Sequence, residues 1–329
     1  MCLVIRDGDE PLGSLRYWEV RLGDEANATR PEIEQIMFSM PTGLGEEEAE
    51  SQLYVVRRRI EKAVTAELIS DFYICSMSSR SIIYKGMFLA EQVTAFFPDL
   101  LDTRFISSFA IYHQRYSTNT MPTWKLAQPF RVLAHNGEIN TIRGNQNWMI
   151  CHEDRMASPL FGDMVEELKP IVAKGSSDSS ALVAVFELMG HGGRSLPMVK
   201  TMMIPAAVDV SGDSDLAKLY AYCNSVMEPW DGPAAIAAYA NNWVIAGLDR
   251  NGLRPMRYVV TNDGLVIAGL ETGMVVVPED RIVERGRIGP GQMMGIDLAR
   301  GEMFSNDALK TELAGKRDWG QWTSRAQQM

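Results

Sequence analysis

Apolar residues recur every three to four positions along residues 45–68, which is the spacing of one face of an α-helix. Leu53, Val56, Ile60, Val64 and Leu68 form this face. Three glutamates open the segment, where the helix dipole favours negative charge. The same spacing predicts further helices over residues 89–97, 178–193 and 214–227.

Short apolar runs rich in β-branched and aromatic residues predict strands. They cover residues 33–40, 104–117 and 130–137, with a hairpin formed by 71–77 and 81–86. After Pro229, five more such runs are separated by Asn-Asn, Asn-Gly and Asp-Gly turn signals, which predicts an antiparallel meander over residues 233–278. Strands early, helices in the middle and strands late predict an α+β domain, with two sheets packed face to face and helices outside.

Charge and composition narrow the class of protein. The chain carries a net charge of −10, which argues against nucleic acid or anionic membranes as partners. Its basic run at residues 57–62 is expected to form the solvated face of a helix. No apolar run is long enough to span a membrane, and charged residues interrupt the N-terminal apolar stretch, so the chain is predicted to be soluble and cytoplasmic. Four widely spaced cysteines predict free thiols, and the four histidines lack metal-ligand spacing.

Three stretches place polar residues at the ends of apolar runs. Arg115 follows one run, and its guanidinium suits either a small carboxylate or the anchoring of a loop. Asn136 and Gly137 suit an oxyanion hole, although Asn-Gly after a strand is by default a turn. Asp178 suits either the ammonium group of an amino acid or the N-cap of a helix. Residues 227–236 and 246–258 look like shaped turns, and the sequence assigns them no chemistry.

Cys2 stands directly behind the initiator methionine. If Met1 were removed, its thiol would lie next to a free α-amine, which is a catalytic arrangement in one group of hydrolases. The alternative is an incidental small apolar residue.

The order and wording of several motifs resemble the glutamine amidotransferase domain of the glutamate synthase large chain, a class II amidotransferase of the N-terminal-nucleophile hydrolase type. The resemblance covers roughly residues 29–300. It rests on PEIEQIMF, LYVVRRRIEK, HQRYSTNT, WKLAQPF, LAHNGEINT, GSSDSSAL, EPWDGPA, GLDRNGLRPMRY and GRIGPGQM. It implies a four-layer αββα sandwich of two mainly antiparallel sheets, incomplete here at the N-terminus.

The resemblance also implies roles for single residues. Arg115, with Thr118 nearby, would bind the carboxylate of glutamine. Asn136 and Gly137 would form the oxyanion hole, and Asp178 would hold the α-amino group. An N-terminal cysteine would be the nucleophile, with its own amine as base. The implied activity is hydrolysis of glutamine to glutamate and ammonia, for transfer to 2-oxoglutarate in glutamate biosynthesis.

The N-terminus departs from the family pattern. The family's mature chain begins with a motif similar to Cys-Gly-Val-Gly-Phe, whereas Leu3 and Val4 follow Cys2 here. We therefore expect an N-terminally truncated piece: residues 1–30 as a non-matching segment, 31–305 as a partial amidotransferase domain, and 306–329 as a tail leading to absent synthase domains. Those domains carry FMN and an iron–sulfur cluster in the family, so no cofactor is expected in this chain.

Three functions stay open. The chain is predicted to be the glutaminase domain of a glutamate synthase, with glutamine, the remaining synthase domains and the small subunit as partners. The missing nucleophile segment keeps open a non-catalytic glutamine-binding remnant. Another class II amidotransferase, serving amino-sugar, purine or asparagine synthesis, is disfavoured by GLDRNGLRPMRY and WKLAQPF.

Overall fold

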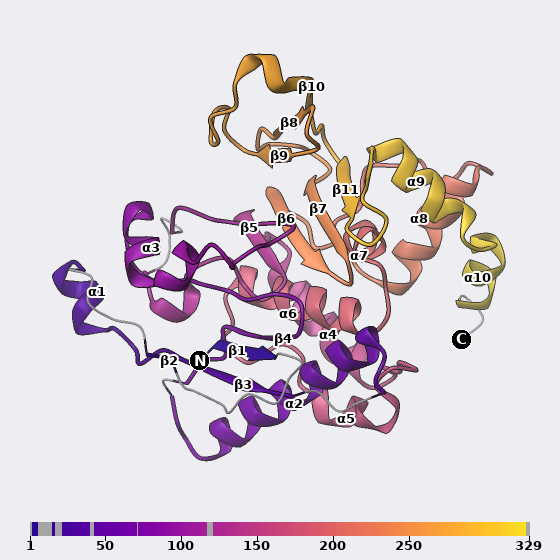
Figure 1. Ribbon diagram of the computed structural model, residues 1–329. Coiled ribbons are helices and arrows are strands. Elements are labelled where there is room, and N and C mark those ends of the chain that lie inside the picture. The colour runs from indigo at the N-terminus through magenta and orange to yellow at the C-terminus, as the bar shows by residue number, and fades with distance from the viewer. Residues whose placement is uncertain are drawn as a thin grey trace. The chain divides into compact units, whose positions relative to one another are not determined.

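The computed structural model describes residues 2–5, 15–16, 22–39, 43–70, 72–116 and 121–326 of the chain (Figure 1). They divide into two compact units. The first unit comprises Met1–Ala134, Arg155–Ile171 and His191–Gly193, and the second comprises His135–Asp154, Val172–Gly190 and Arg194–Met329. Predictions that concern Met1, residues 6–14, 17–21, 40–42, Asp71, 117–120 and 327–329 therefore fall outside the described residues.

The first unit contains a four-stranded sheet in the order β2-β3-β1-β4. β1 (Cys2–Ile5) runs parallel to both β3 (Glu34–Phe38) and β4 (Ser76–Ser78), and β2 (Leu15–Arg16) runs antiparallel to β3. The long helix α2 (Glu46–Ala66) packs on β4 and on the short α5 (Val165–Leu168). Short helices α1 (Asp24–Ala28) and α3 (Val93–Phe96) complete the unit, and α3 joins an aromatic cluster of Phe88, Phe96, Phe97 and Trp124.

Helix α2 forms where the apolar spacing predicts it, but it buries a different face. Leu53 is buried as expected, whereas Val56 is 39% exposed and Leu68, past the end of the helix, is 90% exposed. The buried surface near the middle of the helix instead includes Tyr54 and Arg57. The expectation that residues 57–62 form a solvated face is therefore wrong at Arg57, which is 2% exposed.

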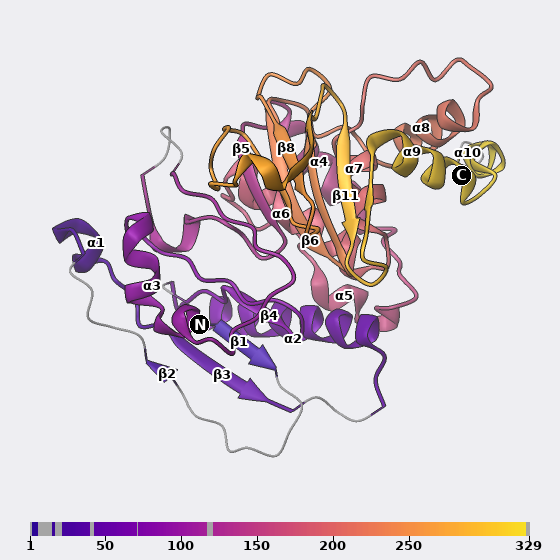
Figure 2. The ribbon, with the colours of Figure 1, turned by 45° about the horizontal axis from the view of Figure 1, so that its top comes forward.

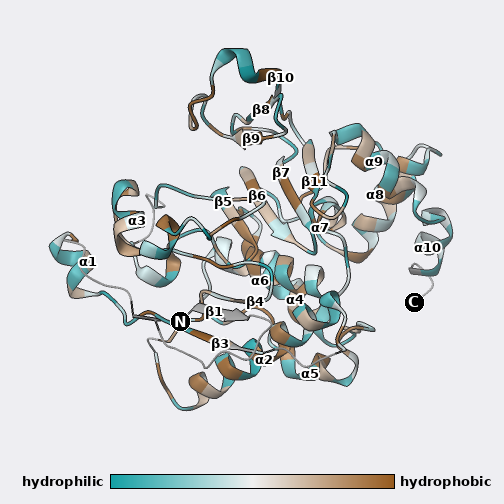
Figure 3. Cartoon of the chain, in the orientation of Figure 1, coloured by the Kyte–Doolittle hydropathy of each residue, from teal (hydrophilic) through white to brown (hydrophobic). Residues whose placement is uncertain are grey.

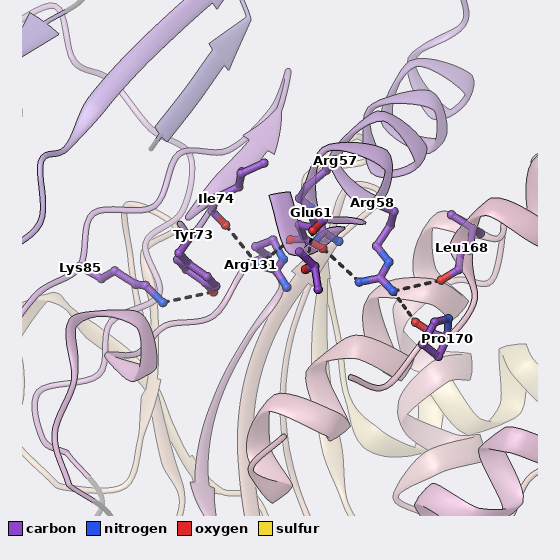
Figure 4. A network of polar contacts seen from close by, with 10 residues as sticks. Arg57, Arg58, Glu61, Tyr73, Ile74, Lys85, Arg131, Leu168 and Pro170 are labelled. Carbon is purple, nitrogen blue, oxygen red and sulfur yellow. Dashed lines mark hydrogen bonds and ion pairs between the residues drawn. The ribbon is translucent and has the colours of Figure 1, made fainter. Parts of the chain in front are cut away.

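Arg57 is buried because it belongs to a network of polar contacts (Figure 4). Its Nη1 lies 2.6 Å from Oε1 of Glu61, and Arg58 and Arg131 approach the same carboxylate at 3.0 and 3.8 Å. Arg58 also donates to the carbonyls of Leu168 and Pro170. Burial alone would raise the pKa of Glu61, but the guanidinium groups of Arg57, Arg131 and Arg58 outweigh it and lower that pKa to about 2.

The second unit is built on a five-stranded sheet in the order β12-β11-β7-β6-β5. The strands are β5 (Leu133–Gly137), β6 (Ala234–Ala240), β7 (Trp243–Leu248), β11 (Met293–Asp297) and β12 (Glu302–Phe304). Neighbouring strands from β6 to β12 are antiparallel. Apolar residues run along β6 and β7 (Figure 3), because both faces of this sheet are covered.

Helices cover one face of this sheet, and a second sheet packs on the other face near the end of β7. α7 (Leu196–Met203) packs on β6 and β7, and α9 (Asn306–Gly315) packs on β11. The three-stranded antiparallel sheet of β8 (Arg257–Thr261), β9 (Val266–Gly269) and β10 (Ile282–Arg287) has the order β10-β8-β9. Ala246, Leu248 and Met294 of the large sheet form one hydrophobic cluster with Tyr258 and Val266 of the small one. The unit thus has two antiparallel sheets with a shared core.

The remaining helices of the second unit are α4 (Ile142–Glu153), α6 (Asp178–His191), α8 (Asp215–Val226) and α10 (Trp319–Ala326). α6 and α8 form where the apolar spacing predicts helices, and apolar side chains of both are buried, including Phe186 and Cys223. α9 and α10 lie beside α8 (Figure 2). Trp319 anchors α10 there, since its indole N–H donates to the Leu313 carbonyl at 2.9 Å and its ring lies 4.9 Å from that of Tyr222.

The predicted α+β class is confirmed, as are the strands at 33–40 and 130–137 and the first four strands expected after Pro229. The single meander expected for those four strands is wrong, because β6 and β7 pair in the five-stranded sheet whereas β8 and β9 pair in the three-stranded one. Three strand predictions are wrong. Residues 104–116 form irregular chain, in which Ile106 and Tyr112 are 88% and 57% exposed. Only Ser76–Ser78 of the predicted hairpin is a strand, and it pairs with β1. Residues 273–278 are not a strand, and β10 begins at Ile282.

Candidate active site

The candidate oxyanion residues lie where β5 ends. Asn136 and Gly137 are the last two residues of this strand, both partly buried, and α4 begins only five residues later. His135, directly before them, is 2% exposed. A strand that stops at a partly exposed Asn-Gly leaves an amide side chain and backbone N–H groups near the surface, which is the chemistry that an oxyanion needs.

Asp178 lies beside this loop. It opens α6, and its Oδ2 accepts the backbone N–H of Ile139 at 2.9 Å. One residue further, the Ser179 hydroxyl lies 2.8 Å from Nδ1 of His135. Two hydrogen bonds therefore join the start of α6 to both sides of Asn136 and Gly137. Since an ionised carboxylate has about four lone-pair sites, Asp178 keeps acceptor capacity for an ammonium group.

The residue that caps the N-terminus of α6 is Ser177, not Asp178. Ser177 accepts the N–H of Ser180 on its hydroxyl at 3.2 Å and the N–H of Ala181 on its carbonyl at 2.9 Å. Ser177 thus caps the helix, while the Asp178 carboxylate accepts the N–H of Ser179 on Oδ1 at 2.7 Å and that of Ile139, in the loop at 135–141, on Oδ2.

The loop rests on a second segment, residues 228–234. The carbonyl of Pro233 accepts the N–H of Glu138 at 2.9 Å, and the carbonyl of Asp231 accepts the N–H of Asn140 at 2.8 Å. The two backbones lie very close together. A Cβ on Gly137 would lie 1.7 Å from the Pro233 carbonyl oxygen, and one on Gly232 would lie 2.0 Å from the Glu138 carbonyl oxygen. Glycine is required at both positions by this backbone-to-backbone approach.

Helix α4 is fastened to the same segment. Thr141 accepts the N–H of Asp231 on its hydroxyl at 2.9 Å, and the amide of the buried Asn145 donates to the Pro229 carbonyl at 3.0 Å. At the far end of α4, His152 lies 2.7 Å from Glu228. The loop at 135–141 is therefore held at each end.

A third segment, residues 249–252, supports the segment 228–234. Asp249, which follows β7, is 1% exposed, and its Oδ2 accepts the N–H of Ala234 at 2.9 Å. Its Oδ1 accepts the N–H groups of Asn251 and Gly252 at 2.8 and 3.1 Å. The next residue, Arg250, pairs with Asp231 at 2.6 Å.

A buried lysine lies near this carboxylate. Lys200 of α7 is 1% exposed, and its Nζ donates to the Gly291 carbonyl at 3.3 Å. Burial lowers the pKa of Lys200 to about 7, helped by the positive charge of Lys310 and opposed by Asp249.

The structure brings together three of the six predicted site residues: Asn136, Gly137 and Asp178. Arg115 lies in exposed, irregular chain of the other unit. Thr118 lies outside the described residues. Cys2 is placed only by its backbone, opposite Gln35 and Ser76 in β1, and its side chain lies outside the description.

Sequence reasoning missed the supporting residues, above all Asp231, Asp249 and Arg250. The available signal was positional: each stands in a glycine-containing turn directly beside an apolar strand of the meander. Turn chemistry explains such residues without invoking a site, so the pattern alone could not distinguish the two.

No group of three or more His, Cys, Asp or Glu side chains that could hold a metal ion occurs among the described residues. Within the same residues, no helix is both long and apolar enough to cross a membrane.

The model of the class II glutamine amidotransferases matches residues 15–322, so the chain belongs to this family. It is similar to the glutamate synthase [NADPH] large chain of Azospirillum brasilense, with 59% identity over 92% of this chain and 20% of that protein. It also resembles the ferredoxin-dependent glutamate synthase of Pyropia yezoensis (42% identity, 94% of this chain, 20% of that one). The Bacillus subtilis glutamate synthase [NADPH] large chain is 40% identical over 92% of this chain and 20% of its own length.

The chain thus spans about a fifth of the length of these relatives. A solved structure of glutamine phosphoribosylpyrophosphate amidotransferase from B. subtilis, complexed with ADP and GMP, matches 59% of this chain and 33% of its own at 20% identity and a TM-score of 0.35.

Proposed function

We propose that this chain is the glutamine-hydrolysing domain of a glutamate synthase, releasing glutamate and ammonia from glutamine for transfer to 2-oxoglutarate. The observation that carries the proposal lies in the second unit, where hydrogen bonds join the loop at 135–141 to the start of α6. The loop that carries the prospective oxyanion hole at Asn136 and Gly137 donates the Ile139 N–H to a carboxylate, Asp178, that suits the α-ammonium of an amino acid. The family match supports glutamine as that amino acid.

Each proposed role follows from charge and donor chemistry. Asp178 binds the α-ammonium, and Arg115, assisted by Thr118, binds the α-carboxylate through a bidentate fork. When a thiol sulfur attacks the side-chain amide carbon of glutamine, the carbonyl oxygen becomes an oxyanion. The Asn136 amide and the Gly137 N–H stabilise that charge. Collapse of the intermediate expels ammonia after protonation, and water then hydrolyses the thioester to glutamate.

Cys2 is the candidate nucleophile of this proposal, with its own α-amine as base once Met1 is removed. Its backbone lies in the middle of a sheet, between β3 and β4. A second function, glutamine binding without hydrolysis, is favoured by one observation: Leu3 and Val4 follow Cys2, where the family motif has a glycine.

The deciding experiment measures ammonia release from glutamine by the purified chain, together with equilibrium binding of glutamine. Release that Cys2→Ser abolishes would establish hydrolysis with Cys2 as nucleophile, and would refute the N-terminal truncation. Absence of release, with glutamine binding that Arg115→Ala abolishes, would establish the binding function. Neither release nor binding would refute both. Arg104→Ala is the control for Arg115, because Arg104 is also an exposed arginine of the same irregular segment and pairs with Asp102 next to it.

The proposal extends to the chain's setting. Its partners are glutamine, the remaining glutamate synthase domains and the small subunit, and it works in the cytoplasm without membrane or nucleic acid. The amidotransferase domain runs from residue 31 to 305, and residues 306–329 lead on to the synthase domains. FMN and the iron–sulfur cluster belong to those domains.

A further inference from the structure

We propose that Asp249 is a positioning residue for the oxyanion hole, acting through the single peptide group between Pro233 and Ala234. This inference rests on the proposed function. It concerns a segment, residues 246–258, to which the sequence assigns no chemistry.

The Pro233–Ala234 peptide is held from both sides. Its N–H donates to Oδ2 of Asp249 at 2.9 Å, and its C=O accepts the N–H of Glu138 at 2.9 Å. The same carbonyl oxygen is the atom that excludes any side chain at Gly137. The orientation of this peptide therefore sets where the backbone of Gly137 and Glu138 can lie, and Asp249 sets the orientation of the peptide.

Asp249 is itself fixed. Its backbone N–H donates to the Ala234 carbonyl at 2.8 Å, so it contacts Ala234 at two points. Its own carbonyl accepts the N–H of Gly291 at 2.7 Å. Its second carboxylate oxygen closes the turn at 249–252. A buried carboxylate bonded to three backbone N–H groups is a rigid reference point, because hydrogen bonds to a charged acceptor are stronger than neutral ones.

A parallel contact supports the other end of the loop. Arg250 pairs with the Asp231 side chain, and the Asp231 carbonyl accepts the N–H groups of Asn140 and Thr141 at 2.8 and 3.3 Å. Since Arg250 is half-exposed, this contact is expected to contribute less than that of Asp249.

The test uses Asp249→Asn in the 329-residue chain. An asparagine amide has one oxygen and one NH2 group, so in either orientation its NH2 faces a backbone N–H that the carboxylate accepted. Asp297→Asn is the matched control. Asp297 is also a buried aspartate of the same sheet, and its Oδ1 caps a turn by accepting the N–H groups of Ala299 and Arg300 at 3.0 and 3.2 Å. It pairs with Trp243 and thus lies at the opposite end of β7 from Asp249.

Two readouts separate positioning from general stability. Hydrogen exchange at the Glu138 amide, followed by NMR, is expected to accelerate at least about tenfold in Asp249→Asn and to stay unchanged in Asp297→Asn. In the glutaminase assay, kcat is expected to fall on the order of tenfold or more with KM for glutamine unchanged, because oxyanion contacts form only in the transition state. A merely structural role would affect both variants alike.

Unchanged Glu138 exchange in a folded Asp249→Asn protein would overturn the inference. So would equal changes in both variants, or a rise in KM without loss of kcat. If the wild-type chain releases no ammonia, that result counts against the proposed hydrolysis, and the exchange measurement alone decides the positioning role. If Asp249→Asn does not fold, Asp249→Glu replaces it, because the longer side chain keeps the charge but displaces the carboxylate from the Ala234 N–H. Faster exchange at the Glu138 amide is expected, and unchanged exchange there would contradict the inference.

Discussion

The two units bury charged groups in different surroundings, with different structural consequences. Around Glu61 in the first unit, a buried carboxylate meets guanidinium groups, so charge compensates charge. At Asp249 in the second unit, a buried carboxylate meets backbone N–H groups from two segments. The first arrangement fastens side chains of α2 to neighbouring chain, whereas the second fixes the path of the backbone. We therefore expect substitutions in the first to change stability, and substitutions in the second to change the geometry of the site.

The largest expected loss of stability follows from Glu61→Gln. The change removes the negative charge that faces the buried Arg57 at 2.6 Å, which should lower the free energy of unfolding by about 3 kcal/mol at pH 7. Because the folded-state pKa of Glu61 is lowered from 4.5 to about 2, its contribution is fully present above pH 4.5 and is lost as the pH falls towards 2. Urea denaturation of both proteins between pH 3 and 7 measures this. A difference that does not shrink below pH 4.5 would contradict the assignment.

Gly232→Ala should lower the free energy of unfolding somewhat less than Glu61→Gln does, but it should disturb the geometry of the candidate site much more. The new methyl group would lie 2.0 Å from the Glu138 carbonyl oxygen, so the loop at 135–141 must move. Overpacking of this kind costs about 1–3 kcal/mol. Gly264→Ala is the control, because Gly264 also has a positive φ (85°) but nothing lies within 4 Å of its Cβ position. Thermal unfolding and glutamine hydrolysis check the pair, and equal losses in both variants would show that backbone conformation, not the collision, is responsible.

Lys200→Met tests whether burial of the Lys200 ammonium group lowers stability. Lys200 titrates near pH 7 when folded and near 10.5 when unfolded, so the unfolded chain binds more protons between these values. The stability of the wild type relative to Lys200→Met should therefore rise with pH in that window, by about 1.4 kcal/mol per pH unit, and stay constant below pH 7. Denaturation at pH 6, 8 and 9 measures the slope. A pH-independent difference would mean that Lys200 stays charged in the fold.

The smallest effect is expected at Arg59, two residues before Glu61 in the chain. Its ion pair with Glu167 is about half exposed on both sides, and water screens such pairs. Arg59→Gln should leave the midpoint of urea denaturation unchanged within error, in contrast to Glu61→Gln on the same helix. A loss comparable to that of Glu61→Gln would remove the distinction between buried and exposed pairs in this unit.

The sequence predicts best where periodicity is reinforced by burial. α6 and the strands β6 and β7 form where the sequence predicts them, because most of their side chains are apolar and buried. The strand expected at 104–117 fails since composition records strand preference but not the presence of a partner strand, and its side chains are largely exposed. The prediction of a solvated face is wrong at Arg57 for a related reason. A basic run is normally solvated, and the Glu61 carboxylate that makes burial of Arg57 possible is brought to it only by folding.

For the site, residue chemistry predicts which groups can recognise an amino acid, but not what holds them. Asn136, Gly137 and Asp178 are polar groups at strand and helix ends, and the structure places them in one loop pair. Asp249 could not be predicted, because its partner Ala234 offers only a backbone N–H, which every residue but proline carries. Its role depends on where two distant turns meet.

The hydrogen bonds between the 135–141 loop and residues 228–234 also have a consequence for how the chain folds. Thr141 and Asp231 are 90 positions apart, and Asn145 and Pro229 are 84 apart. Contacts of such long sequence separation tend to form late, because closing a large loop costs conformational entropy before the contacts compensate for it. During synthesis on the ribosome, the loop cannot acquire this framework until residues beyond Asp249 have emerged. We therefore expect the prospective oxyanion hole to form only after residues 228–252 are available to hold it.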